Sequence, residues 1–203
     1  MLENSTILLV RHGEKPGGGC SRDTDGDVHL SRDGDTRAQA YVNYFQTFKA
    51  ETADGTQSEA VTLNFLFAAK NSHSSHRPVE TLTPLAEATN LPFNVDIKDA
   101  DYDTELIPAL ADPQYANSNI LICWHHGTLV QLADELLRVN DQPQPDLTVA
   151  NTWPTTYDCN TFGWLFQIRY DAHGTVQPDW TRCLNEQLMN DDTTDPHDPS
   201  RTD

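Results

Sequence analysis

The 203-residue chain carries 31 acidic and 13 basic residues, which gives a formal net charge of −18, and 37% of its residues are hydrophobic. A chain of this length can bury one substantial core and is short for two large domains. The negative charge repels DNA, RNA and anionic membranes at long range, so we expect neither nucleic acid nor a membrane as a partner. A high-salt or cold habitat is an alternative origin of the acidity.

No segment approaches the roughly eighteen apolar residues of a membrane span. The first apolar run, Ile7–Val10, is short and leads directly into charged residues, unlike a secretory signal peptide. We therefore expect a soluble, cytoplasmic protein.

The four cysteines, Cys20, Cys123, Cys159 and Cys183, show no close pairing such as C-x-x-C. This spacing argues against a disulfide framework or a zinc site. The sequence predicts reduced, mostly structural thiols in a reducing compartment.

The N-terminal part of the chain predicts a strand, a loop and a helix. Ser5–Val10 is typical of a buried strand in a parallel sheet. In the Gly- and Asp-rich loop Lys15–His29, the segment Asp23–Asp27 is similar to a calcium-binding loop, but its glycine comes too early. We interpret it as a solvated loop, with calcium binding as the alternative. Ser31 suits the N-cap of an amphipathic helix with Ala38, Tyr41, Val42, Phe45 and Phe48 on one face.

Strands and helices continue to alternate after a polar linker. Leu63–Ala69 predicts a second buried strand, and Pro78–Thr89 predicts a helix because proline suits the first helical turn. A short strand is expected at Phe93–Ile97 and a short helix at Thr104–Ala111. Asn119–Trp124 predicts the third strong strand.

The C-terminal part begins with a helix that places Leu129, Leu132, Ala133, Leu136 and Leu137 on one face. Phe162–Tyr170 alternates as a strand does, and Thr175–Cys183 either extends it or pairs with it. This order predicts an α/β three-layer sandwich with a mainly parallel central sheet, formed by residues 1–189. Residues 190–203 are polar and rich in Asp, and we expect a disordered acidic tail there.

Each of the three strong strands runs into basic or titratable side chains. These are Arg11 and His12 after the first strand, His73, His76 and Arg77 after the second, and His125 and His126 after the third. Because parallel strands end at one edge of a sheet, these residues are expected to converge on a pocket. Guanidinium groups bind phosphoryl oxygens in two-pronged fashion, and a neutral imidazole can attack phosphorus. The pattern predicts phosphoryl transfer through histidine.

The chain resembles the histidine phosphatase superfamily, which has the phosphoglycerate mutase-like fold. The resemblance covers about Ser5–Leu137 and is carried by motifs in the family's order: Arg11-His12-Gly13-Glu14 after a strand, Leu30-Ser31 with Gly34, Arg37-Ala38, Arg77 with Thr81, and His126-Gly127 before a helix. The resemblance implies a covalent phosphohistidine that is hydrolysed or passes its phosphoryl group to another acceptor. It implies no cofactor and requires no metal.

The resemblance also implies the roles of individual residues. His12 corresponds to the nucleophile, Arg11 and Arg77 to the phosphate clamps, and His126 to the second catalytic histidine. His125 either lines the rim of the pocket or packs in the interior. Among the other histidines near the strand ends, His29, His73 and His76 are interpreted as solvated loop residues, with substrate contact by His73 or His76 as the alternative.

The chain departs from the family at two places. Arg77 is preceded by Ser74-Ser75-His76 and followed by Pro78, in place of the family's Ser-x-Leu-x-Arg-Ala. The substrate of other family members therefore cannot be assigned to this chain. Gly127 stands where the acid phosphatase branch has its aspartate proton donor. The donor is then expected among Asp99, Asp101, Asp103 and Glu105, and we favour Asp103 or Glu105. Glu14 or a histidine is the next candidate.

The sequence therefore predicts a metal-independent phosphatase that cleaves a small phosphomonoester through phospho-His12. The expected substrate is a small phosphorylated metabolite, and a phosphoprotein is the alternative. A phosphomutase, a non-catalytic phospholigand-binding module and a metal-dependent hydrolase are the rival functions. The sequence makes no prediction about the oligomeric state.

Overall fold

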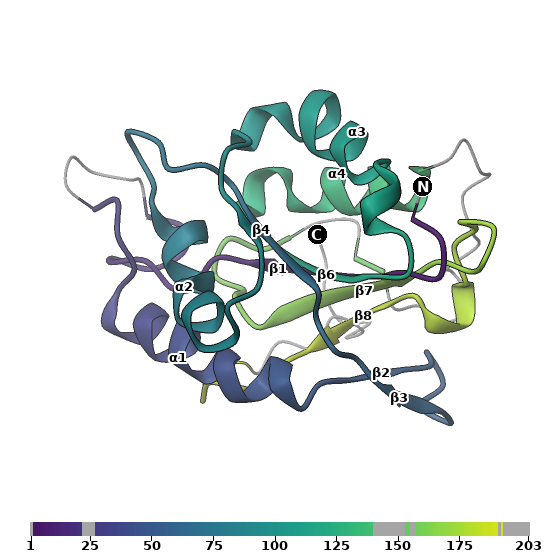
Figure 1. Cartoon of the computed structure of the whole chain (residues 1–203). Helices are drawn as coiled ribbons and strands as arrows, with labels where there is room; N and C mark the ends of the chain where they lie inside the picture. The colour runs from purple at the N-terminus through teal and green to yellow at the C-terminus, as the bar shows by residue number, and fades with distance from the viewer. Residues whose placement is uncertain (1, 22–26, 140–152, 155–156, 191, 193–203) are drawn as a thin grey trace.

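A computed structural model describes the chain except for residues 1, 22–26, 140–152, 155–156, 191 and 193–203. Its centre is a six-stranded sheet with the order β5-β4-β6-β1-β7-β8 (Figure 1). Four neighbouring strands are parallel: β1 (Thr6–Arg11), β4 (Phe65–Ala68), β5 (Phe93–Asn94) and β6 (Asn119–Trp124). The antiparallel strands β7 (Trp164–Arg169) and β8 (Arg182–Asn185) complete the sheet. The prediction of a mainly parallel sheet is confirmed.

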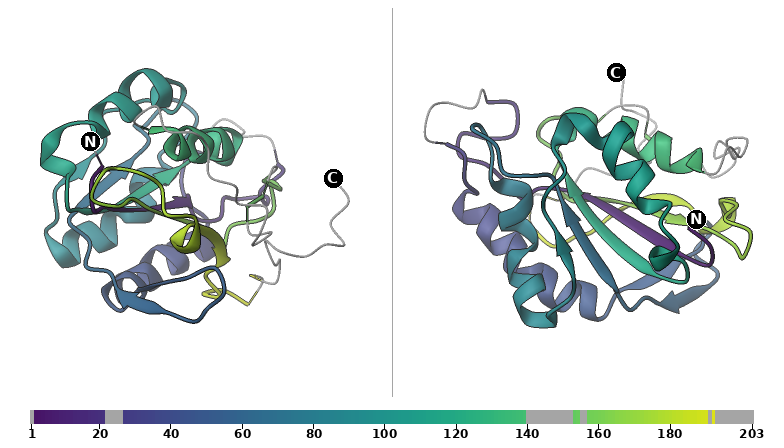
Figure 2. Two further views of the ribbon diagram at one scale, coloured as in Figure 1. Left: turned by 90° about the vertical axis from the view of Figure 1, so that its right-hand side faces the viewer. Right: turned by 45° about the horizontal axis from the view of Figure 1, so that its top comes forward.

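Helices cover both faces of this sheet. α1 (Arg32–Gln46) and α2 (Arg77–Thr89) lie on one face, and α3 (Ile107–Leu110) and α4 (His126–Leu137) lie on the other (Figures 1 and 2). Short turns complete the described structure: 3-10 turns at Asp99–Asp101, Pro113–Tyr115 and Pro178–Trp180, and one π-helical turn at Tyr102–Leu106. Among the described residues, no helix has the length and apolar composition of a membrane span. The three-layer α/β architecture is as predicted.

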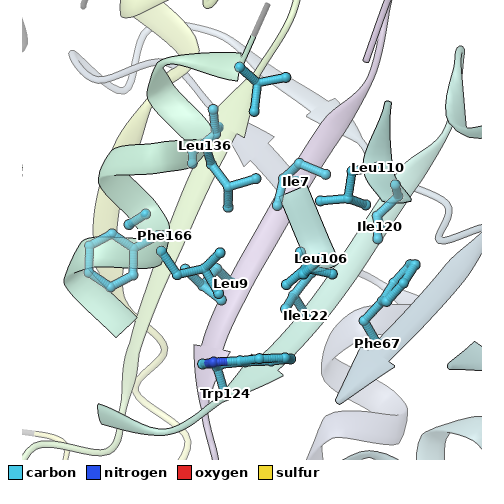
Figure 3. Close-up of a cluster of buried hydrophobic side chains, with 14 of the residues drawn as sticks. Ile7, Leu9, Phe67, Leu106, Leu110, Ile120, Ile122, Trp124, Leu136 and Phe166 are labelled. Atoms are coloured by element: carbon cyan, nitrogen blue, oxygen red, sulfur yellow. The ribbon is translucent and has the colours of Figure 1, made fainter. Parts of the chain in front are cut away.

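The sheet separates two hydrophobic cores because successive strand residues point to opposite faces. In β1, Ile7 and Leu9 pack into the core beneath α4, whereas Leu8 and Val10 pack into the core beneath α1 and α2. Figure 3 shows the first of these cores, in which Trp124 closes the end nearest the carboxyl edge of β6. A strand buried on both faces explains the continuous apolar run of the sequence.

Helix α1 begins as its sequence predicts. Ser31 is the N-cap, and its hydroxyl oxygen accepts a hydrogen bond from the Gly34 N–H at 3.2 Å. The residues predicted for its apolar face include Ala38, Tyr41 and Phe45, which are buried. The Ser31 N–H donates to the Glu14 carbonyl at 2.9 Å, which fixes the start of α1 against the loop that follows β1.

Several element predictions were wrong in detail. The polar linker after α1 contains a small antiparallel hairpin, β2 (Lys49–Glu51) and β3 (Ser58–Ala60), which has no apolar alternation because both strands are short and largely exposed. Within the expected helix Thr104–Ala111, only Ile107–Leu110 is α-helical, since a π-turn precedes it. Most of the expected disordered tail, and most of the Asp23–Asp27 segment considered for calcium, lie outside the described residues.

Candidate active site

His12 lies one residue beyond β1, where the sheet pairing continues. Its backbone N–H donates to the carbonyl of Trp124 in β6 at 3.1 Å, and its side chain is buried. Ring atom Nδ1 lies 2.7 Å from the Gly13 carbonyl oxygen. A carbonyl oxygen only accepts hydrogen bonds, so Nδ1 carries the proton and Nε2 carries the lone pair. The nitrogen that carries the lone pair is thereby defined by one backbone contact.

The surroundings of His12 keep its imidazole neutral. Burial lowers the pKa of His12 well below its ordinary value, and the nearby His125, Arg11 and Arg77 side chains lower that pKa further. The Gly13 carbonyl acts in the opposite direction and is outweighed. Only the neutral ring has a lone pair with which to attack.

Arg11 is a fully buried cation beside this histidine. Its Nη1 donates to the carbonyl oxygens of Cys159 at 2.7 Å and Thr161 at 2.6 Å, and its guanidinium carbon lies 3.8 Å from the centroid of the Phe162 ring. Burial lowers the pKa of Arg11 to about 10, so the group stays charged at neutral pH.

Two of the Arg11 donors, Nε and Nη2, have no hydrogen-bond acceptor among the described residues. Buried polar atoms are nearly always hydrogen-bonded, and each exception calls for an explanation. An anion with several oxygens is the natural acceptor for both donors of one guanidinium face.

Arg77 is the first residue of α2 and is also buried. Its Nη1 donates to the backbone carbonyl of Asp27 at 2.6 Å. The charge of Arg77 contributes to lowering the pKa of both Arg11 and His12, which places the three groups within electrostatic reach of one another. Two guanidinium groups and a neutral imidazole therefore lie buried near one another at this edge of the sheet.

The backbone around His12 is held by α2 and α1. The hydroxyl oxygen of Thr81 accepts from the Gly13 N–H at 2.9 Å and donates to the Arg77 carbonyl at 2.7 Å. Gly34 faces the same loop so closely that a Cβ atom on it would lie 2.3 Å from the Glu14 carbonyl oxygen. Two of the sequence motifs are thereby explained, because Thr81 and Gly34 hold the backbone next to His12 in place.

Solved structures with similar folds were found by structural comparison. An Escherichia coli protein assigned as an alpha-ribazole-5'-P phosphatase matches with a TM-score of 0.55 and 16% identity over 90% of this chain and 97% of its own. A phosphoserine phosphatase variant from Entamoeba histolytica, in complex with phosphoserine, matches with a TM-score of 0.52 and 13% identity over 91% of this chain and 99% of its own. No protein-family model and no curated protein matched the sequence.

The chain shares the α/β fold of these two phosphatases. In this phosphoglycerate mutase-like fold, Arg11 ends β1, His12 follows it, and Arg77 begins α2 after β4, so the three residues lie toward the edge where the parallel strands end. The resemblance seen in the sequence and the arrangement of the strands agree.

The third strand end presents two histidines, which the structure places differently. The ring of His125 lies beside His12, with 5.2 Å between the ring centroids, in an edge-on arrangement. His126 is the first residue of α4 and is half-buried. The sequence favoured His126 as the second catalytic histidine and left His125 open between the pocket rim and interior packing. The ring contact with His12 makes His125 a second candidate.

The four acidic candidates for proton donor also differ. Asp103 and Glu105, the favoured pair, lie on the π-turn and are exposed. Asp99 is half-buried, and its Oδ1 accepts from the Thr128 hydroxyl in the first turn of α4 at 2.8 Å. Burial raises the pKa of Asp99 above its ordinary value, and the bond from Thr128 only partly offsets this. Asp99 is therefore the candidate that combines a position near β6 with an environment favouring the protonated form.

Glu14 does not face the pocket. Its carboxylate accepts from Arg37 Nε at 3.0 Å and from Arg37 Nη2 at 2.6 Å. The Arg37 side chain is completely buried and also pairs with Glu186 and Asp192. This network ties α1 to the end of the described chain, so Arg37 and Glu14 act as structural supports.

The expectation of reduced cysteines was wrong for one pair. Cys20 and Cys159 form a disulfide, with their Cα atoms 4.9 Å apart. The two residues are separated by 139 positions in the sequence, so no local spacing could reveal the bond. Cys123 and Cys183 are buried and take no part in this disulfide, as expected for structural thiols.

Two groups of described residues have ligand atoms close enough to hold a metal ion: Cys20, Asp158 and Cys159, and His29, His76 and Glu80. The disulfide removes the thiolate ligands of the first group. Neither group includes His12, Arg11 or Arg77.

Proposed function

We propose that the protein is a phosphatase that cleaves a small phosphomonoester through a covalent phosphohistidine on His12. The observation that carries this proposal is a buried, neutral imidazole whose Nε2 carries the lone pair, near two Arg11 donors that have no acceptor among the described residues. A phosphoryl group would satisfy these donors and present phosphorus to the nucleophile.

In the first step, Nε2 of His12 attacks phosphorus while the bond from phosphorus to the ester oxygen breaks. Arg11 and Arg77 stabilise the charge on the three phosphoryl oxygens, and the Nδ1–H bond to Gly13 holds the ring as positive charge develops on it. In the second step, water attacks phosphorus, the bond from phosphorus to Nε2 breaks, and the carboxylate that gave its proton to the leaving oxygen takes a proton from the water, so that phosphate is released. Fixed guanidinium charges can perform this stabilisation without a metal ion.

The leaving oxygen needs a proton, and we assign its donor to Asp99. A carboxyl group with a raised pKa keeps its proton closer to neutral pH, which general acid catalysis requires. Asp103 and Glu105 stay candidates from the sequence, but their exposure gives them no comparable environment. His125 and His126 are the candidates for donating hydrogen bonds to the transferring oxygens.

Small phosphorylated substrates are favoured by the phosphoserine bound to the Entamoeba histolytica protein and by the acidity of this chain, which repels large polyanions. A phosphoprotein is the alternative substrate. A cytoplasmic location stays a prediction, and the Cys20–Cys159 disulfide argues against it because cytosolic thiols are generally kept reduced.

The decisive experiment compares the wild type with His12→Ala on a chromogenic phosphomonoester at several pH values. The wild type should release phosphate and yield acid-labile protein-bound phosphate after rapid quenching, whereas the variant should do neither while keeping its circular dichroism spectrum. Near-normal turnover by the variant would overturn the assignment of the nucleophile. Failure of the wild type to release phosphate at any pH would favour the binding module.

The rival functions separate in the same assay. Transfer of the phosphoryl group to a second hydroxyl compound faster than to water would favour a phosphomutase. Loss of turnover after exhaustive chelation, with recovery on adding one metal, would favour a metal-dependent hydrolase.

A further inference from the structure

A group of metal-ligand side chains lies beside the pocket, outside the proposed chemistry. His29 belongs to the segment that leads into α1, His76 is the N-cap of α2, and Glu80 lies in the first turn of α2. One ligand atom from each of the three residues lies within 4.8 Å of the other two.

The geometry of the three residues suits one ion. His76 and Glu80 are four residues apart across the start of α2, so their side chains project from the same face. His29 approaches from the facing segment, where its Nδ1 contacts Glu80 Oε1. Tetrahedral zinc ligands at about 2.0–2.2 Å from the metal lie within about 3.5 Å of one another. His76 is half-buried and His29 is exposed, so both side chains have room to rotate toward that spacing.

Two hydrogen bonds hold the two segments together, one between backbone groups and one from a backbone N–H to the Glu80 carboxylate. The His76 N–H donates to the Val28 carbonyl at 2.8 Å, and the Leu30 N–H donates to Glu80 Oε2 at 2.9 Å. These bonds fix the residues on either side of His29 against the start of α2. The framework of a site is therefore built, and only side-chain rotation is needed to complete it.

A simple surface ion pair between His29 and Glu80 accounts for only part of this arrangement. Such a pair is worth little, because its side chains are 61% and 31% exposed. It does not explain the ring of His76, which stands edge-on to that of His29 with 5.1 Å between centroids. Two imidazoles and one carboxylate form the ligand set that borderline divalent metals prefer, and the net charge of −18 attracts cations.

We propose that His29, His76 and Glu80 bind one divalent transition-metal ion of the zinc class, with water completing its coordination. The ion would join the segment before α1 to the start of α2. Asp27, whose carbonyl accepts from Arg77, is two residues from one ligand, and Arg77 itself follows another. Metal binding therefore braces the segment that positions Arg77 and leaves the nucleophile untouched.

The test measures zinc binding to metal-free protein with its disulfide intact, by isothermal titration calorimetry, together with the visible absorption of added Co²⁺. The wild type should bind one ion. His29→Ala, His76→Ala and Glu80→Gln should each weaken zinc affinity by about tenfold or more, since even indirect partners of a metal contribute that much. His73→Ala is the matched control, because His73 is an exposed histidine of the same loop and should leave affinity unchanged.

Two further measurements separate this site from others. Omitting reductant keeps Cys20 and Cys159 bonded to each other, so they cannot supply thiolates. His12→Ala should retain zinc binding, which excludes the pair of His12 and His125 as the site. No zinc binding by the wild type, affinity unchanged in all three ligand variants, or loss of binding in His12→Ala would each overturn the proposal. None of these readouts requires phosphatase activity, so the two proposals fail separately.

Discussion

Replacing Arg11 by lysine tests whether its geometry, beyond its charge, is needed. The Arg11 Nη1 is already held by the carbonyls of Cys159 and Thr161, and the Nε and Nη2 atoms are the donors available to a phosphoryl group. Lysine has a single ammonium group, which cannot bond the two carbonyls and present a planar pair of donors at the same time. Its amine would also lose its proton more readily at a site where burial already lowers the pKa of arginine to about 10.

Hydrogen bonds to charged groups contribute about 1.5 kcal/mol each at the lower end of their range, so losing two raises the barrier by about 3 kcal/mol. This corresponds to a decrease in kcat/KM of roughly 150-fold. The assay is steady-state hydrolysis of nitrophenyl phosphate, with the inhibition constant of phosphate measured in parallel. Arg32→Lys, at an exposed arginine of α1, is the control and should behave as the wild type. If Arg11→Lys keeps kcat/KM within about threefold of the wild type, the two open donors do not face the substrate.

The remaining predictions concern the proton donor, the support of the pocket and pH. Asp99→Asn should slow the hydrolysis of alkyl phosphates about a hundredfold. Hydrolysis of nitrophenyl phosphate should be unaffected, because its leaving group needs no proton. The same selective loss in Asp103→Asn would assign the proton donor to Asp103 instead. Thr81→Val should lower the free energy of unfolding by about 1–3 kcal/mol in urea titrations, because it leaves the buried glycine N–H without an acceptor. Thr83→Val, which removes a hydroxyl bonded only within its own helix, should cost less, and an equal cost would argue against the role of Thr81. Burial raises the pKa of Glu186 from 4.5 to about 7, so its contribution to stability is present below pH 4.5 and is lost as the pH rises through 7. Thermal unfolding of the wild type should show this decline and Glu186→Gln should not; identical profiles would contradict the shift.

The sequence predicted the elements that have strong local patterns. β1 and β6 are continuous apolar runs, and α1 has both an N-cap and an apolar face, so their places follow from short-range rules. The convergence of Arg11 and Arg77 could also be predicted, because parallel strands bring distant strand ends to one edge. The short hairpin β2–β3 carries no such pattern and was missed.

The features of the site that could not be predicted from the sequence depend on contacts between distant segments. Only packing decides that Asp99 meets Thr128 and is partly desolvated while Asp103 stays in water. The approach of His125 to His12 depends on the orientation of a ring at the end of β6, which residue spacing cannot give. The spacing in the sequence places Glu80 one helical turn from His76. It does not show that His29, which belongs to another segment, lies beside them.

The disulfide between Cys20 and Cys159 gives the chain a ring with two free arms. A protease that cuts once between these cysteines opens the ring, yet both products stay covalently attached to each other. Arg11 and His12 lie on the N-terminal arm, and Arg77 lies inside the ring, so the nicked molecule still holds all three in one covalent unit. Such a molecule should migrate as one band in electrophoresis without reductant and as two bands once the bond is reduced.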